Sequence, residues 1–318
     1  MKRMMRLNKI LIILVLAISY SALSSCGSSE TTTPQTIDYS TFSWKIYQTG
    51  VDYLNDVWGS SSTDVFAVGR KGTIFHYDGT AWTNMDSGTL EELLGVWGAS
   101  ESDVYAVGEN GIILHYDGKT WDTMINVETR GLFSIWGSSP SDIFAVGFQG
   151  IIVHHDGDSW SVMESGTENH LYNIWGTSST NVYAVGLCYT IVHYNGDEWS
   201  TITSDDTIAF PYTGVWGYSP TDIFVAGNRG KMIHYDGDEW TKVDVADTPA
   251  VHFLDIWGSS SSGIFTIGDN GMMFHYDGDK WVSMDIDVYN DLSSIWGFPD
   301  LELFIVGEDG IILHYQGE

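Results

Sequence analysis

The chain of 318 residues is strongly acidic, with 42 Asp and Glu residues against 13 Lys and Arg residues and a formal net charge of −29 at pH 7. Four of the 13 basic residues lie in the first nine positions, which leaves nine for the rest of the chain. This charge excludes a nucleic-acid partner and argues against docking on an anionic lipid surface. Cys188 is the only cysteine besides Cys26, so a folded domain after the N-terminal segment must be held together by packing alone.

Residues 1–26 have the features of an export signal. Lys2 and Arg3 begin a basic segment, and residues 10–17 form an unbroken apolar run that is too short to span a bilayer. Residues 23–26 read Leu-Ser-Ser-Cys, which resembles the lipobox of bacterial lipoproteins and implies cleavage before Cys26 and lipidation of that cysteine. The alternative is an ordinary signal peptide that happens to carry a cysteine. We therefore expect a lipid-anchored protein of the bacterial cell envelope, at the outer membrane.

Residues 27–41 are rich in Ser and Thr, contain Pro34 and show no apolar period. This composition is typical of a flexible tether. Fully extended, a segment of this length spans about 50 Å. The tether would hold a following domain clear of the lipid headgroups.

Residues 42–318 contain seven copies of one unit. A Val/Ile-Trp-Gly triplet recurs at intervals of 39 or 41 residues, with its tryptophan at Trp58, Trp97, Trp136, Trp175, Trp216, Trp257 and Trp296. Each unit predicts four short strands: one ending at this tryptophan, two rich in β-branched and aromatic residues, and a fourth that carries a second tryptophan. An Asp-Gly pair, a strong hairpin signal, joins the third and fourth strands in most units. No segment has a sustained helical period, so the domain is expected to be all-β.

A four-stranded unit of this length, repeated seven times, is typical of a seven-bladed β-propeller with antiparallel blades. The last unit stops at Glu318, before its fourth strand, whereas Trp44 precedes the first unit by 14 residues. The equivalent spacing from Trp82 to Trp97 is 15 residues. We therefore predict that the N-terminal strand completes the last blade and closes the ring, which removes exposed sheet edges.

The repeat resembles those of secreted bacterial propellers grouped as WD40/YVTN/BNR-like. Its Asp-Gly-x-x-Trp turn is similar to the Asp-box of sialidase-type propellers, but the spacing from Asp to Gly is one residue shorter. The resemblance covers residues 42–318 and implies the propeller fold. It implies little about activity, because propellers carry many unrelated functions.

A histidine lies 18 residues after the first tryptophan of every unit, and an acidic or amide residue lies six after it in all units except the sixth, which has Gly263. Copies in different blades are too far apart to share a metal ion. We predict a hydrogen-bond network inside each blade instead, similar to the Asp-His-Trp networks of WD40 blades. The histidines are His76, His115, His154, His193, His234, His275 and His314, and their partners are Asp64, Asp103, Asp142, Asn181, Asp222 and Glu302.

Two other acidic features invite a metal interpretation. The Asp-Gly-Asp turns, such as residues 156–158, offer two or three oxygens, whereas calcium loops supply six or more, so hairpin chemistry is favoured. Asp56 and Asp255 lie two residues before their tryptophans, where other units have Gly, Ser or Asn. If the first strand lines the central channel, these carboxylates could bind a cation or could be ordinary polar lining, and the sequence leaves both open.

Loops after the second and fourth strands of a meander emerge on one face, which we call the variable face because the repeat is broken there. The opposite turn face carries similar Gly-Ser-Ser and Asp-Gly turns throughout. Cations beside exposed aromatic residues suit an anionic or sugar-like ligand, although an unconstrained surface would also vary. The candidate ligand-binding residues are Arg70, Lys71, Arg130, Phe148, Gln149, Tyr189, Phe210, Tyr212, Arg229 and Lys231.

Three functions fit these features. The first is a binding or scaffolding module that presents the variable face to an envelope protein or a glycan. The second is a glycoside hydrolase or lyase of the sialidase-like type, which needs convergent arginines and a pair of carboxylates about 5–10 Å apart. The third is an assembly factor for envelope complexes. We favour a monomeric binding module without cofactor or metal, and assign no catalytic residue, because the recurring residues already have structural roles.

Overall fold

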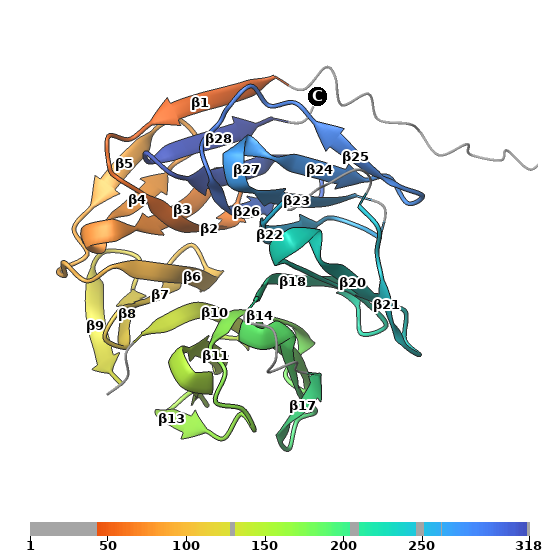
Figure 1. Cartoon of the computed structure of the whole chain (residues 1–318). Coiled ribbons are helices and arrows are strands. Elements are labelled where there is room, and N and C mark those ends of the chain that lie inside the picture. The colour runs from red at the N-terminus through yellow and green to blue at the C-terminus, as the bar shows by residue number, and fades with distance from the viewer. Residues whose placement is uncertain (1–42, 128–130, 204–209, 246–250, 262, 317–318) are drawn as a thin grey trace, which may run out of the picture. The chain divides into compact units, whose positions relative to one another are not determined.

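The computed structural model describes residues 43–127, 131–203, 210–245, 251–261 and 263–316. These residues form seven four-stranded antiparallel sheets, arranged as blades around a central channel (Figure 1). The predicted signal, Cys26 and the tether lie outside the described residues. Within the described part of the chain, no helix is long and apolar enough to cross a membrane.

The strands of each blade follow one another in the sheet from the channel outward. Blade 1 comprises β2 (Leu54–Ser61), β3 (Asp64–Gly69), β4 (Ile74–Tyr77) and β5 (Trp82–Met85), and blade 2 comprises β6 (Leu93–Ser100), β7 (Asp103–Gly108), β8 (Ile112–Tyr116) and β9 (Trp121–Asn126). Blade 3 comprises β10 (Leu132–Ser139), β11 (Asp142–Gly147), β12 (Ile152–His155) and β13 (Trp160–Met163), and blade 4 comprises β14 (Leu171–Ser178), β15 (Asn181–Gly186), β16 (Thr190–Tyr194) and β17 (Trp199–Thr203). Blade 5 comprises β18 (Tyr212–Ser219), β19 (Asp222–Gly227), β20 (Met232–Tyr235) and β21 (Trp240–Lys242), and blade 6 comprises β22 (Phe253–Gly258), β23 (Ile264–Gly268), β24 (Met273–Tyr276) and β25 (Trp281–Met284).

Blade 7 shows that the predicted closure is correct. Its first three strands are β26 (Leu292–Gly297), β27 (Leu303–Gly307) and β28 (Ile311–Tyr315), and the fourth is the N-terminal strand β1 (Trp44–Gln48). β1 runs antiparallel to β28 with Trp44 opposite Tyr315, and their rings lie 5.6 Å apart. On the channel side, the indole of Trp296 donates a hydrogen bond of 3.1 Å to the carbonyl oxygen of Gly59 in blade 1. Figure 1 shows β1 along the outer edge of this blade.

The Trp-Gly pair of the repeat is explained by packing between blades. A Cβ atom added at Gly137 would lie 2.6 Å from the Trp97 ring of the preceding blade, and the same close approach recurs at Gly98, Gly176, Gly217, Gly258 and Gly297. Six of the seven first-strand tryptophans therefore need a glycine in the next blade, and the seventh, Trp296, donates a hydrogen bond to Gly59 instead. The second strands, such as β3, are buried on both faces between neighbouring blades, which explains their continuous apolar sequence.

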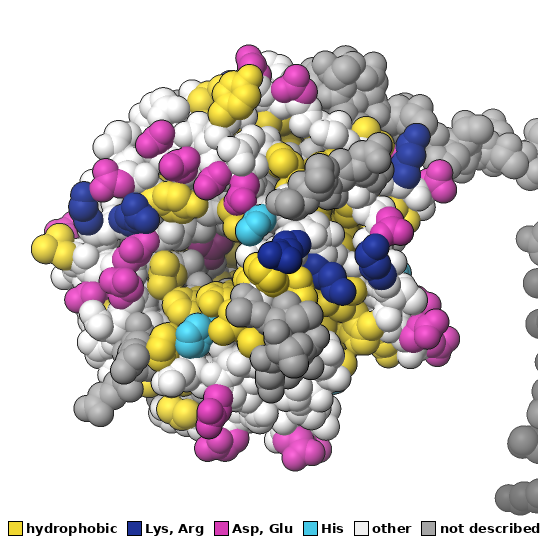
Figure 2. Space-filling model, in the orientation of Figure 1, with side chains coloured by type: hydrophobic (Ala, Val, Ile, Leu, Met, Phe, Trp, Pro, Cys, Tyr) yellow, Lys and Arg dark blue, Asp and Glu magenta, His cyan; other side chains and the backbone are white. Residues whose placement is uncertain are grey.

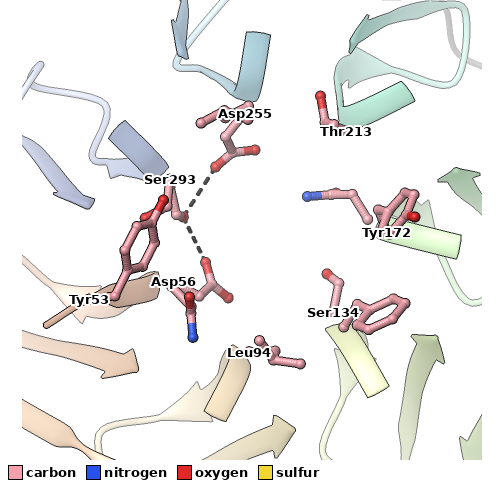
Figure 3. Close-up of a pocket in the computed structure, with 13 residues that line it drawn as sticks. Tyr53, Asp56, Leu94, Ser134, Tyr172, Thr213, Asp255 and Ser293 are labelled. Atoms are coloured by element: carbon pink, nitrogen blue, oxygen red, sulfur yellow. Dashed lines mark hydrogen bonds between the residues drawn. The ribbon is translucent and has the colours of Figure 1, made fainter. Parts of the chain in front are cut away.

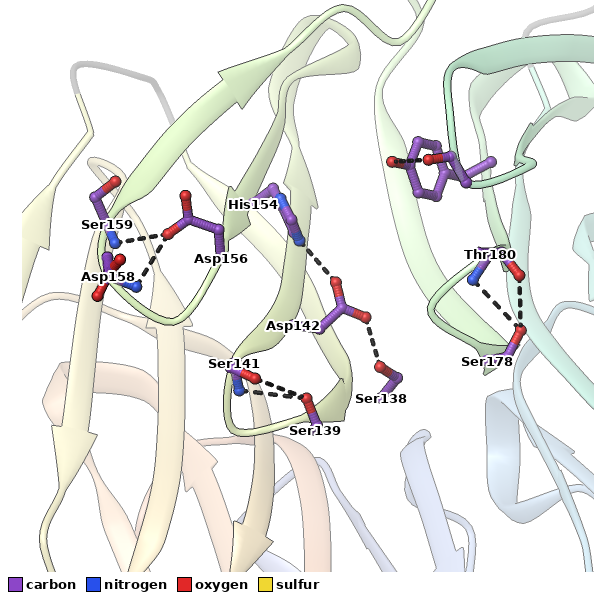
Figure 4. Close-up of polar contacts among 12 residues, drawn as sticks. Ser138, Ser139, Ser141, Asp142, His154, Asp156, Asp158, Ser159, Ser178 and Thr180 are labelled. Carbon is purple, nitrogen blue, oxygen red and sulfur yellow. Dashed lines mark hydrogen bonds and ion pairs between the residues drawn. The ribbon is translucent and has the colours of Figure 1, made fainter.

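The predicted network inside each blade is confirmed in the six blades that carry the acidic or amide residue. In blade 3, His154 Nε2 lies 2.7 Å from Asp142 Oδ1, and the hydroxyl of Ser138 also donates to Asp142 (Figure 4). The His154 ring stacks on Phe144 at 4.2 Å. In blades 1 and 3 the aspartate of the network also accepts a hydrogen bond from a serine hydroxyl, of Ser60 and Ser138 respectively. In blade 6, where Gly263 replaces the acid, burial lowers the pKa of His275 to about 4.

The Asp-Gly turns use their first aspartate to close a hairpin. Oδ1 of Asp156 accepts hydrogen bonds from the backbone amides of Asp158 and Ser159, at 3.0 and 2.9 Å (Figure 4). These hydrogen bonds hold the pKa of Asp156 below its usual range. The favoured hairpin interpretation accounts for this carboxylate without a metal ion.

Candidate functional site

The channel opens on the variable face into a pocket of about 250 Å³. First-strand side chains from all seven blades line it, and they surround an open centre in Figure 3. The lining residues are Tyr53, Asn55, Asp56, Leu94, Phe133, Ser134, Tyr172, Asn173, Thr213, Leu254, Asp255, Ser293 and Ser294. We call this cavity the mouth pocket.

In three blades, the residue three positions before the first-strand tryptophan joins its blade to the next one at the rim of the pocket. Asn55, Thr213 and Ser293 each donate a hydrogen bond of 2.6–2.7 Å to a carbonyl oxygen at the start of the next blade's first strand. The equivalent positions in the other blades carry large apolar or aromatic residues, including Phe133 and Tyr172. The mouth pocket is therefore polar over some blades and aromatic over blades 3 and 4.

Asp56, Ser294 and Asp255 form a chain of hydrogen bonds across blades 1, 7 and 6. Ser294 Oγ lies 2.7 Å from Asp56 Oδ1 and 3.1 Å from Asp255 Oδ2 (Figure 3). Asp56 also accepts from the backbone amide of Val96, and Asp255 accepts from that of Ile295. Each carboxylate thus joins its own blade to the next one while it faces the mouth pocket.

Burial raises the pKa of Asp56 to about 6 and that of Asp255 to about 7, and the charge of Asp56 adds to the shift at Asp255. Because an unfolded aspartate has a pKa of about 4, the folded state holds protons that the unfolded state has lost. The resulting stabilisation is complete below pH 4 and is lost as the pH rises through 6 and 7.

We therefore expect Asp255→Asn, which mimics the protonated acid, to gain stability relative to the wild type between pH 5 and pH 8. Urea unfolding of both proteins at each pH measures this difference. The matched control is Asp156→Asn, whose carboxylate has a lowered pKa and should not show this trend. A difference between Asp255→Asn and wild type that does not change with pH would contradict the assignment.

Aromatic side chains gather beside the mouth pocket over blades 3, 4 and 5. His170 stacks on Phe148 at 4.3 Å, Phe133 stacks on Tyr172 at 5.3 Å, and Tyr189 lies 5.0 Å from Tyr212. His170 accepts a hydrogen bond from the backbone amide of Gln149 at 2.9 Å, and burial lowers its pKa. We call this group the aromatic crescent: Phe133, Phe148, His170, Tyr172, Tyr189, Phe210 and Tyr212.

Two of the predicted cations lie on this crescent. The guanidinium of Arg229 lies 3.8 Å from the centre of the Phe210 ring, and the ammonium of Lys231 lies 5.4 Å from that of Tyr189. Both belong to the turn between β19 and β20, in which Arg229 is exposed. Figure 2 shows dark-blue side chains beside hydrophobic ones next to the central depression.

The other predicted cations are placed differently. Arg70 lies 3.4 Å from Glu92, and Lys71 lies 2.6 Å from Asp52, so both are paired with acids of blades 1 and 2. Arg130 lies outside the described residues. The structure thus brings together Phe148, Gln149, Tyr189, Phe210, Tyr212, Arg229 and Lys231, and it separates Arg70 and Lys71 from them.

Phe133, His170 and Tyr172 were missed by the sequence reasoning. Phe133 and Tyr172 stand three residues before a repeat tryptophan, and His170 stands five before one, where they read as part of the core. The sequence did carry a signal for Phe133 and Tyr172. The position three residues before the tryptophan is aromatic in two adjacent units and carries a smaller residue in the others.

No protein-family model matches the sequence, and no curated protein matches it. Solved structures do match. A structure of YCF48 bound to D1 peptide has a TM-score of 0.71 at 20% identity and covers 86% of this chain and 97% of its own. YCF48 from Cyanidioschyzon merolae has a TM-score of 0.70 at 16% identity, covering 86% and 98%. The WD40 propeller domain of Doa1 has a TM-score of 0.71 at 12% identity, covering 86% and 96%.

At these identities the likeness shows the fold alone. The chain contains a seven-bladed WD40-like β-propeller. Its blades agree with the propeller expected from the repeat.

Proposed function

We propose that this protein is a non-catalytic binding or scaffolding module of the bacterial cell envelope. Its variable face holds a segment of a protein partner, and lipid on Cys26 anchors the chain to the outer membrane. The anchor is supported by the lipobox-like end of the N-terminal segment. Several acyl chains on one residue hold a protein on a membrane far more firmly than a single chain does.

The observation that carries the binding function is the aromatic crescent with Arg229 and Lys231 beside it. Apart from Tyr212, which is buried, the rings of the crescent are half-buried. Such rings offer a large contact area at a small entropic cost, and aromatic residues and arginine are enriched where proteins bind one another. Arg229 is exposed and pairs with none of the described acids, whereas Arg70 and Lys71 already face acids. We therefore expect an apolar segment with an acidic residue or terminal carboxylate near Arg229.

A protein segment is favoured over a glycan as the partner. One propeller of similar fold, YCF48, was solved with a peptide bound. That finding belongs to YCF48, but it shows that a propeller of this size can hold a peptide. An assembly factor, which uses the propeller as a docking platform, would act through the same surface.

The hydrolase alternative has one observation in its favour. Asp56 and Asp255 face a pocket on the variable face and lie within hydrogen-bond reach of a single hydroxyl, which is the kind of carboxylate pair that the enzyme requires. Both carboxylates, however, accept backbone amide hydrogen bonds that join neighbouring blades. The two described arginines of the prediction do not converge on them, since Arg70 pairs with Glu92 and Arg229 lies on Phe210. Binding is therefore the better account.

Site-specific cross-linking in intact cells tests the proposal. A photoreactive amino acid at Gln149, which is exposed beside the crescent, should give a discrete cross-linked protein. The matched control places the same group at Tyr218, which is 59% exposed at the turn-face end of β18 and should give no such species. Equal capture at both positions, or capture at Tyr218 alone, would overturn the proposal.

A further inference from the structure

The mouth pocket has two carboxylates in its lining and no basic side chain to pair with them. Asp56 and Asp255 face the cavity, and none of its lining residues is Lys, Arg or His. Carboxylates that are partly removed from water are costly unless a positive charge or a proton meets them. Arg70 lies over the ring of Tyr53, a residue of the lining, but it pairs with Glu92.

The hydroxyl between the two carboxylates cannot satisfy both. Ser294 has one hydroxyl proton, and its shorter contact, 2.7 Å, is with Asp56. At 3.1 Å, Asp255 then meets the oxygen of Ser294 without a proton, unless Asp255 itself is protonated. The chain Asp56–Ser294–Asp255 is therefore completed by a proton on Asp255 or by a cation at the pair. The carboxylates' other hydrogen bonds come from backbone amides, two to each carboxylate.

The rest of the lining indicates what kind of cation would fit. Leu94, Leu254 and the stacked pair Phe133 and Tyr172 form an apolar and aromatic wall. A calcium ion takes six to eight oxygen ligands, and the described residues include no group of three or more Asp, Glu, His or Cys side chains placed to hold a metal ion. An organic cation can place its charge at the carboxylates and its methylene stem on the wall, where aromatic rings add cation–π attraction.

We propose that the mouth pocket binds a primary alkylammonium group, supplied by a lysine side chain of the docked protein segment. An ammonium fits better than a guanidinium because the acceptors come from two carboxylates on different blades. The three N–H donors of an ammonium point in different directions and can reach both carboxylates. The planar guanidinium presents its donors as a fork that matches one carboxylate at a time. A volume of 250 Å³ admits such a group with some water.

This inference rests on the proposed function only for the source of the ammonium, because the pocket itself can be tested with a small amine. Below about pH 7, binding should also release a proton, since burial raises the pKa of both carboxylates and the cation replaces a proton that they hold there. The other titratable groups of the lining are Tyr53 and Tyr172, and burial raises the pKa of both, so they remain neutral near pH 7.

Calorimetry on the full chain in a non-ionic detergent tests the inference. We expect n-butylammonium chloride and Nα-acetyl-lysine amide to bind in the millimolar range or tighter, and to bind at least tenfold more tightly at pH 8 than at pH 5. Sodium chloride at equal ionic strength and 1-pentanol should not compete. Asp255→Asn and Asp56→Asn should each weaken binding at least tenfold, after circular dichroism and melting show that the variants fold.

Matched controls separate this site from the crescent. Asp291→Asn removes an acid of the variable face that is not part of the mouth pocket, and it should leave amine binding unchanged. Arg229→Ser should weaken the protein partner but not the small amine. The inference is overturned if the wild type does not bind the amines, if both Asp variants bind them normally, or if calcium chloride displaces them at equal concentration.

Discussion

Deleting residues 42–50 is expected to lower the melting temperature by about 10 °C or more. The deletion removes β1, which supplies the whole outer strand of blade 7, and it exposes the edge of β28. It also removes Trp44, which packs on Tyr315 and on the core shared by blades 5, 6 and 7. Losing one large aromatic side chain typically costs about 3–5 kcal/mol, and each kcal/mol shifts the melt of a domain of this size by about 2–4 °C.

Thermal unfolding followed by circular dichroism measures the effect. Deletion of residues 30–38 is the matched control, since it removes nine residues of the predicted tether and should leave the melt unchanged. Trp44→Ala and Trp82→Ala form a second pair, because the two tryptophans occupy the same position of blades 7 and 1. A melt unchanged by the loss of residues 42–50 would mean that β1 does not close the ring.

Substituting Gly186 by alanine should destabilise the protein by about 3 kcal/mol. A Cβ atom at this position would lie 1.8 Å from the carbonyl oxygen of His170, which also accepts a hydrogen bond from the amide of Leu187. The clash is with backbone at the start of β14, so no side-chain rotation relieves it, and overpacking of this kind costs about 1–3 kcal/mol or more. Because His170 stacks on Phe148, the substitution should disturb the aromatic crescent as well.

Urea unfolding reports the change in stability, and the histidine signals in a two-dimensional NMR spectrum report the environment of His170. Gly263→Ala is the control, because a Cβ there would meet only the movable hydroxyls of Ser259 and Ser260. Gly186→Ala with wild-type stability and an unshifted His170 would show that the close approach is not a real constraint.

The fold was predictable from the sequence because its determinants repeat. Each first-strand tryptophan is followed by a glycine, and the structure shows why, since the ring of one blade occupies the space beside the glycine of the next. The spacing from Trp44 to Trp58 also predicted which strand completes blade 7. The repeated histidine and its acidic or amide partner likewise predicted the hydrogen bond inside a blade, whereas the added serine hydroxyls of blades 1 and 3 were not foreseen.

The site was less predictable because it depends on contacts between blades. Because loops after the second and fourth strands of a blade emerge on the same face, the sequence placed Arg70 and Arg229 on one face. Only the structure shows that Arg70 pairs with Glu92 and that Arg229 lies on Phe210. Likewise, Asp56 and Asp255 could be assigned to the channel from their positions. Their connection through Ser294 exists because closure makes blades 6, 7 and 1 neighbours.

The most direct test of the central claim is the affinity of the cross-linked partner, once identified, for two matched double variants. Arg229→Ser with Lys231→Ser removes the cations of the aromatic crescent, whereas Arg70→Ser with Lys71→Ser removes those paired with acids on the same face. We predict that the first variant binds the partner at least tenfold more weakly and that the second binds it within twofold of the wild type. Equal losses in both variants, or a loss in the second alone, would contradict a binding site over blades 3, 4 and 5.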